Sequence, residues 1–260
     1  MVWQWPLNEE GPLLFLPDPA VEWPPKEKEV FLFESEDKSY HQAGSIFIKR
    51  ELPSAVGPYV KERFFVEPIG LLVLANKTTI PVPELVAYGR DADGLLFVAT
   101  RYIFGSVRGD MAATACRMAQ HHRPLQIDTP CRACADVVRD KADRFLREVV
   151  LTQLATERSC RTGLGGVVVP PRWVLEHDKR ETWPVLTSER EEYVFTHQDL
   201  VLHNLLIDTR TLEVLALLDT EECGYFPPEL QQWKHDRPGQ FTLYQDMELV
   251  REHIRLLSGQ

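Results

Sequence analysis

The stretch that decides the fold reads Thr196-His197-Gln198-Asp199-Leu200-Val201-Leu202-His203-Asn204, and Leu217-Leu218-Asp219 follows it after a second apolar run. Its polar residues have the spacing H-x-D-x-x-x-x-N, with a further Asp fifteen residues after Asn204. Phosphoryl transfer from a nucleotide requires a carboxylate that orients the acceptor hydroxyl, and hard oxygen ligands that hold a divalent metal. We therefore interpret Asp199 as the catalytic carboxylate, and Asn204 with Asp219 as ligands of Mg²⁺.

His197 is expected to brace this loop by hydrogen bonding, and we count it with Asp199 among the candidate catalytic residues. Asp219 ends a continuous apolar strand, where an unpaired carboxylate would be costly, so we expect a metal or hydrogen-bond partner for it. A simpler interpretation remains open for Asp199 and Asn204, whose side chains could merely cap a turn.

The composition is that of an ordinary folded protein. The chain has 260 residues, of which 44% are hydrophobic and 26% are charged, and this length allows one large domain or two lobes that share a cleft. The formal net charge of −10 argues against nonspecific nucleic-acid binding and against an anionic membrane surface. A neutral or cationic small substrate fits this charge better.

The chain shows no sign of a leader or of a membrane span. Residues 1–16 have no basic start before an apolar run, and no stretch approaches the roughly 20 apolar residues that a bilayer requires. We therefore expect a cytoplasmic protein.

The five cysteines include one C-x-x-C pair, Cys131 and Cys134, with His121 and His122 upstream. A zinc site is one interpretation. Reduced thiols on or near a helix are the favoured alternative, because no second ligand pair stands at a familiar spacing.

The first part of the chain is predicted to be rich in strands. Residues 1–29 contain many prolines and form an N-terminal arm, partly docked through Trp3, Trp5 and Trp23. Residues 30–33 and 45–50 are predicted as a hairpin around a polar loop at 34–44. Residues 59–76 are predicted as a helix that Pro68 kinks or shortens, 78–83 as an extended turn, and 95–104 as a strand.

The second part is predicted to be mostly helical. Residues 106–133 have no readable pattern, whereas 134–158 carry apolar residues at helical spacing. Short strands are expected at 193–196, 205–208 and 213–218, and a helix at about 243–257. This order predicts an α+β fold with an N-lobe at 30–104 and a C-lobe at 105–260.

Several segments together resemble the aminoglycoside-phosphotransferase-like (choline-kinase-like) family, specifically its fungal branch. That branch typically reads F-x-H-x-D-L-x-x-x-N-x-x-V-D and then I-I-D-W-E-x-A-G-F-x-P-P-E, and this chain reads FTHQDLVLHNLLID and LLDTEECGYFPPEL. Four further segments are similar to the family: AGSIFIKREL (43–52), TTIPVPELV (78–86), TRYIFG (100–105) and GLGGVVVPPRWV (163–174). The resemblance covers roughly residues 30–230 and implies a two-lobed, protein-kinase-like fold that uses ATP and Mg²⁺.

The family pattern assigns further residues of the expected nucleotide site. It makes Lys49 the strand lysine that contacts phosphates, and Glu67 the helix glutamate that pairs with it. Thr100, Arg101 and Tyr102 become the hinge that meets adenine through backbone groups. The pattern also implies the roles of catalytic carboxylate and metal ligands for the residues named above.

The chain departs from the family at four places. Thr220 stands where the family has Trp, Pro68 follows the helix glutamate, and Gln198 stands where Gly or Asn is usual. No glycine-rich loop precedes Lys49, and residues 34–44 form an acidic loop instead, in which Lys38 and Ser39 are candidates to compensate in part.

Three functions follow from this pattern. The first is an ATP- and Mg²⁺-dependent kinase for a hydroxyl on a small, amine-bearing or neutral metabolite. The second is a pseudokinase or binding protein with a degenerate nucleotide site, which the departures favour. The third is a kinase-fold enzyme recruited to other group-transfer or ligation chemistry in secondary metabolism. Glu221 and Glu222 either line a pocket for a cationic acceptor or form a solvated turn.

Overall fold

A computed structural model describes residues 28–116, 130–231, 233 and 246–260. The predicted N-terminal arm lies outside the described residues except at its last two positions, and so do its three tryptophans and the two histidines before the C-x-x-C pair.

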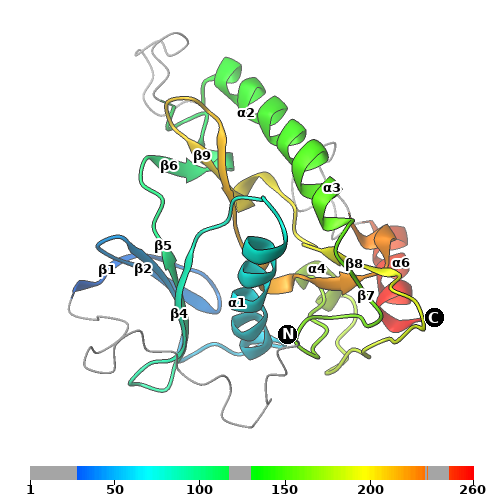
Figure 1. Ribbon diagram of the computed structural model, residues 1–260. Coiled ribbons are helices and arrows are strands. Elements are labelled where there is room, and N and C mark those ends of the chain that lie inside the picture. Colours follow the sequence, from blue (N-terminus) through cyan, green and yellow to red (C-terminus); the bar gives the residue numbers. More distant parts are fainter. Residues whose placement is uncertain (1–27, 117–129, 232, 234–245) are drawn as a thin grey trace.

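An antiparallel five-stranded sheet forms the first part of the described chain (Figure 1). Its strands are β1 (Val30–Glu34), β2 (Lys38–Ala43), β3 (Ile46–Glu51), β4 (Leu85–Arg90) and β5 (Leu96–Arg101), in the order β1-β2-β3-β5-β4. The predicted loop at 34–44 is wrong over most of its length, because it contains β2. A tight turn, closed by a 2.8 Å hydrogen bond from Ser35 N to Lys38 O, lets the chain reverse without glycine.

Helix α1 (Val60–Lys77) packs against this sheet and continues through Pro68 without a break. The expectation of a shortened helix is therefore wrong. Pro68 removes only its own N–H from the helix ladder, while Phe64, Val66 and Leu74 are buried on both sides of it and hold the helix in place. Tertiary packing outweighs the local preference of this one residue.

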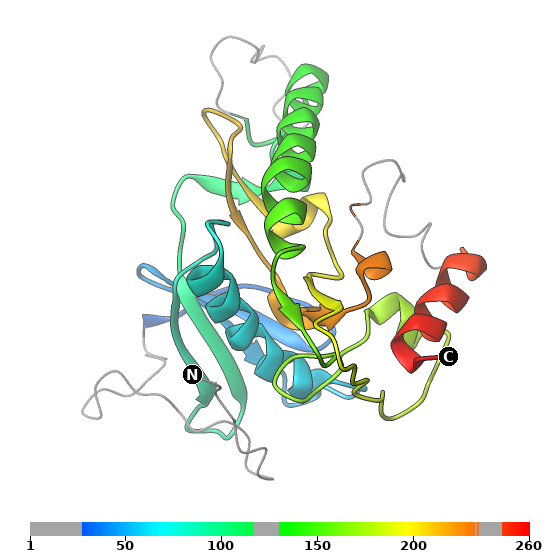
Figure 2. The same ribbon diagram turned by 45° about the vertical axis from the view of Figure 1, so that its right-hand side comes forward.

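The second part of the described chain carries most of the helices and two small sheets (Figure 2). One sheet contains β6 (Ser106–Arg108), β9 (Leu205–Asp208) and β10 (Val214–Leu217), and the other contains β7 (Arg158–Ser159), β8 (Tyr193–Thr196) and β11 (Gly224–Phe226). The helices are α2 (Arg132–Arg144), which runs through a π-helical stretch (Phe145–Val150) into α3 (Leu151–Leu154), then α4 (Arg172–Leu175) and α6 (Met247–Ser258). Short 3-10 turns occupy Gly109–Met111, Leu202–Asn204, Thr220–Glu222 and Pro228–Leu230.

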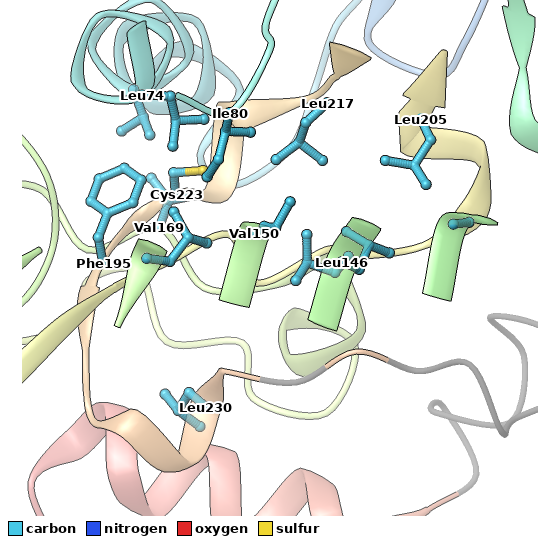
Figure 3. Close-up of a cluster of buried hydrophobic side chains, with 14 of the residues drawn as sticks. Leu74, Ile80, Leu146, Val150, Val169, Phe195, Leu205, Leu217, Cys223 and Leu230 are labelled. Carbon is cyan, nitrogen blue, oxygen red and sulfur yellow. The ribbon is translucent and has the colours of Figure 1, made fainter. Parts of the chain in front are cut away.

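The main hydrophobic core joins α1, the long continuous helix formed by α2 and α3, and the strands that flank the predicted catalytic loop (Figure 3). Its buried members include Leu74, Ile80, Leu146, Val150, Phe195, Leu205 and Leu217. Because β8 ends just before the loop and β9 begins just after it, core packing fixes both ends of that loop. The predicted α+β class, with a sheet-rich first part and most helices in the second, is confirmed. None of the helices in the described ranges is long and apolar enough to cross a membrane.

Candidate active site

Three charged side chains from three elements meet beside the five-stranded sheet. Lys49 lies in the middle of β3, Glu67 on α1, and Asp219 two residues after the end of β10. The Lys49 Nζ donates to Glu67 Oε1 at 2.5 Å and also to the Asp219 carboxylate. Lys49 and Glu67 are 9% and 3% exposed. Lys49 therefore points into the protein and not to solvent.

The three side chains of this group differ in how strongly each one stays ionised. Burial disfavours the charged form of Lys49, but Asp219 and Glu67 raise its pKa well above the ordinary value, so it stays an ammonium. Burial also opposes ionisation of Asp219, and Lys49 with Lys38 nevertheless hold the pKa of this carboxyl well below its usual range. Burial raises the pKa of Glu67 to about 7 despite its contact with Lys49. Asp219 is therefore the permanently charged partner at neutral pH.

Two residues of the site have left-handed backbones. Gln198 has φ 66° and Asp219 has φ 63°, a region that non-glycine residues seldom adopt and that is often found at functional sites. The Gln198 amide is held by hydrogen bonds to Val169 O at 3.0 Å and Glu222 O at 2.7 Å. The positive φ explains why Gly or Asn would suit this position, and the two bonds help Gln198 to occupy it.

Asp199, the predicted catalytic carboxylate, is fixed in place by Asn204, one of the two predicted metal ligands. The Asn204 amide nitrogen donates to Asp199 Oδ2 at 2.8 Å and to Asp199 O at 2.9 Å, which leaves the Asn204 oxygen for other contacts. His197 Nε2 donates to Leu218 O at 2.8 Å and so ties this loop to the residue before Asp219. Burial lowers the pKa of His197, which keeps the ring neutral at pH 7.

A cavity of about 190 Å³ is lined by both Asp199 and Asp219. It is lined by Ser35, Lys38, Tyr40, Arg172, Trp173, Asp199, His203, Asp219, Glu221 and Glu222. A hydroxyl compound in this cavity would reach Asp199 and a cation at Asp219 together.

The oxygen atoms needed for a divalent cation are close together. Carboxylate oxygens of Glu67, Asp219 and Glu221 lie within 4.8 Å of one another. Asp219 is the best placed of these ligands, because it lines the cavity and its side chain is 35% exposed. Hard oxygen donors of this kind suit Mg²⁺, so the residues fit the expected ion. Asn204 is 2% exposed, and only its side-chain oxygen is available to join them.

Glu221 and Glu222 are buried and paired inside the protein. Lys38 Nζ lies 2.5 Å from Glu221 Oε2, and Arg63 Nη2 lies 3.0 Å from Glu222 Oε1. Both residues line the cavity, as one of the two interpretations of the sequence expects, and they do not form a solvated turn. Their charges are, however, already met by cations of the chain.

The turn between β1 and β2 is also bound to the second part of the chain. Asp37 accepts a 2.7 Å hydrogen bond from Arg172, which starts α4, and the adjacent Lys38 pairs with Glu221. Sequence reasoning gave no role to Arg63, Arg172 or Asp37, although Arg172 lies inside the segment GLGGVVVPPRWV and Asp37 inside the predicted acidic loop. The two prolines before Arg172 marked only a turn.

The predicted hinge lies at the end of β5. Thr100 is opposite Phe47 and therefore on the same sheet face as Lys49. The amides of Arg101 and Tyr102 donate to Glu84 O and Ser45 O, both at 2.8 Å. Their N–H groups are thus already used, and the predicted adenine contact through residues 100–102 stays a prediction.

Thr220, which stands where the family pattern has Trp, packs closely against α1. The Thr220 hydroxyl donates to Glu67 O at 2.8 Å, and a Cβ added at Gly70 would lie 2.8 Å from the Thr220 Cβ. This close packing places the residue after Asp219 directly against the helix that carries Glu67.

Glu222 provides a test of the electrostatics. Burial raises its pKa to about 7, with Asp199 and Glu221 acting in the same direction and Arg63 and Arg172 opposing. The folded protein thus binds a proton more tightly than the unfolded chain, so Glu222 makes stability fall as pH rises from about 4.5 to about 7. Over this pH range, the raised pKa of Glu222 would lower the free energy of unfolding by roughly 3 kcal/mol.

We expect Glu222→Gln to weaken this fall in stability. Denaturant unfolding at pH 5 and pH 8 measures it, with the exposed Glu189→Gln as the matched control. Identical pH dependence in wild type and Glu222→Gln would contradict the assigned environment.

Comparison with known proteins gives a distant likeness only. No family model and no curated protein matches the chain. Among solved structures, aminoglycoside 2'-phosphotransferase-IIIa in complex with GDP is 14% identical, covering 89% of this chain and 77% of that chain with a TM-score of 0.48.

Two further structures match less closely. Aminoglycoside-3'-phosphotransferase of type VIII is 18% identical over 87% of this chain and 94% of that chain, with a TM-score of 0.37. A thermostable mutant of APH(4)-Ia with AMP-PNP and hygromycin B is 12% identical over 77% and 68%, with a TM-score of 0.41. At these values no chemistry is carried from those proteins to this chain.

Proposed function

We propose that this chain is an ATP- and Mg²⁺-dependent phosphotransferase that acts on a hydroxyl group of a small molecule. The observation that carries the proposal is the position of the Lys49 ammonium. It is held between Glu67 and Asp219, next to the cavity that Asp199 also lines. A fixed cation, a charged metal ligand and a second carboxylate are the parts that phosphoryl transfer requires.

Each residue has a separate task in this reaction. Lys49 would contact the nucleotide phosphates, and Glu67 would orient it. Mg²⁺, when bound at Asp219 with the Asn204 oxygen, would neutralise phosphate charge. Asp199, held by the Asn204 amide, would accept the proton of the acceptor hydroxyl. His197 would keep the loop in place through Leu218.

The acceptor is limited by the size and charge of the cavity. A volume of about 190 Å³ suits a small metabolite or one end of a larger one. The lining contains four carboxylates against two cations, which favours a neutral or amine-bearing acceptor until Mg²⁺ binds. Glu221 and Glu222 are paired internally, so an amine of the acceptor would have to compete with Lys38 and Arg63 for them. The proposed location is the cytoplasm, which supplies ATP and Mg²⁺.

A binding protein without transfer activity is the second candidate. The observation that favours it is the β1–β2 turn, which lacks glycine and whose Asp37 and Lys38 are tied to Arg172 and Glu221. Nucleotide phosphates that approach Lys38 would have to displace Glu221. In this second candidate, nucleotide binding would not depend on Mg²⁺.

Thermal melting with ATP separates the two candidates. At about a hundredfold excess over Kd, ATP with Mg²⁺ should raise the Tm by roughly 5–10 °C. We expect Asp219→Asn to remove most of the Mg²⁺-dependent part, because it loses the charge while Asn tolerates the left-handed backbone. A rise of equal size without Mg²⁺ would favour the binding protein. No rise under any condition would contradict the proposed nucleotide site.

A further inference from the structure

Three of the five cysteines converge at the start of α2. Cys134 lies in the first turn of this helix, Cys131 directly precedes it, and Cys116 comes from the segment after the 3-10 turn Gly109–Met111. The Cys134 thiol donates to the Cys116 sulfur at 3.2 Å. A backbone hydrogen bond of 3.2 Å from Cys131 N to Ala113 O joins the two segments.

We propose that Cys131, Cys134 and Cys116 form a thiol–disulfide exchange site that takes a low-molecular-weight disulfide as its oxidant. This inference is independent of the proposed phosphotransferase activity. Cys116 and Cys134 are 3% and 1% exposed, whereas Cys131 is only half-buried, so an outside reagent reaches Cys131 first. Access and reactivity together decide which thiol is attacked by the reagent.

The surroundings of Cys131 and Cys134, like their accessibility, make Cys131 the more reactive of the two thiols. The Cys131 sulfur accepts a hydrogen bond from the Cys134 backbone N–H, and this lowers the pKa of Cys131. Burial raises the pKa of Cys134 to about 12. The outer thiol is thus the better nucleophile and the inner thiol is protected until a mixed disulfide forms beside it.

A shared metal ion fits the three thiols less well. Within the described ranges, the one group of three or more such side chains whose ligand atoms all lie within 4.8 Å of one another is Glu67, Asp219 and Glu221. The three sulfurs do not meet that spacing. Pairwise closeness, as between Cys116 and Cys134, is what a disulfide needs.

The exchange proceeds in balanced steps. The Cys131 thiolate attacks one sulfur of the small disulfide RSSR, forms a mixed disulfide and releases RS⁻, which takes up a proton. Cys134, deprotonated as it reacts, attacks the Cys131 sulfur, forms the Cys131–Cys134 disulfide and releases the second RSH. Cys116 then attacks Cys134, which yields the Cys116–Cys134 disulfide and returns Cys131 to a thiol. Overall, two protein thiols and RSSR become one protein disulfide and two RSH.

The test uses the full-length reduced protein and oxidised glutathione as the probe. Free thiols are alkylated at set times, and disulfides are located by non-reducing peptide mapping. We expect Cys116–Cys134 as the end product, and Cys131→Ser to slow its formation about tenfold or more. Cys116→Ser should stop the reaction at Cys131–Cys134. Cys160→Ser, which removes a half-buried thiol elsewhere, should change nothing.

Three outcomes would overturn the proposal. Glutathione could remain on Cys131 without being resolved, or Cys131→Ser could be oxidised at the wild-type rate. The purified wild type could also carry one zinc ion that Cys134→Ser loses, which would identify a metal site instead.

Discussion

Replacing Asp199 by Asn is expected to lower phosphotransfer by roughly a thousandfold, the scale of one positioned general base. The substitution keeps the shape of the side chain, and the Asn oxygen can still accept the hydrogen bond from Asn204. What it removes is the capacity to take a proton from the acceptor hydroxyl. Folding and nucleotide binding should therefore be nearly unchanged while turnover is lost.

The measurement is ADP formation with a panel of small hydroxyl compounds, for wild type and variant side by side. Asp140→Asn is the matched control, because Asp140 is exposed on α2. Thermal melting with ATP and Mg²⁺ shows whether the Asp199→Asn protein still binds the nucleotide. Turnover by this variant at the wild-type rate would remove Asp199 from the mechanism.

Local sequence was sufficient to predict the elements that flank the predicted catalytic loop. Strands β8, β9 and β10 follow short apolar runs that turns interrupt, and the structure has them where the pattern predicts. The closeness of Lys49 and Glu67 was implied by a family resemblance and not by any periodicity. In the structure these two residues form an ion pair of 2.5 Å.

The elements that sequence reasoning missed depend on distant partners. Strand β2 has few apolar residues, and it forms because it pairs with β1 and β3 along its length. Arg63 and Arg172 are isolated charges in the sequence, and only folding brings them to Glu222 and Asp37. Such long-range ion pairs have no local signature, since residues far apart in the chain contribute the two charges.

Lys49→Met is expected to abolish nucleotide-dependent stabilisation and also to lower the free energy of unfolding by about 3 kcal/mol. The ammonium is the cation that Asp219 and Glu67 share, and its removal leaves two carboxyl groups facing each other, of which Glu67 is buried. The pKa of Glu67 is already about 7 with Lys49 present, so it rises further in the variant, and the repulsion is relieved only when Glu67 takes up a proton. The variant should thus be less stable even in the absence of any ligand.

A double substitution separates the structural role of Lys49 from its role toward phosphate. Lys49→Met combined with Glu67→Gln leaves one carboxylate instead of two, so we expect it to recover part of the lost stability, measured by denaturant unfolding. Nucleotide binding should not recover, because no cation replaces the ammonium. If the double variant is no more stable than Lys49→Met, the Lys49–Glu67 pair is not what holds the site together. If it regains ATP binding, the phosphates are contacted by another cation, and Lys38 is then the residue to replace next.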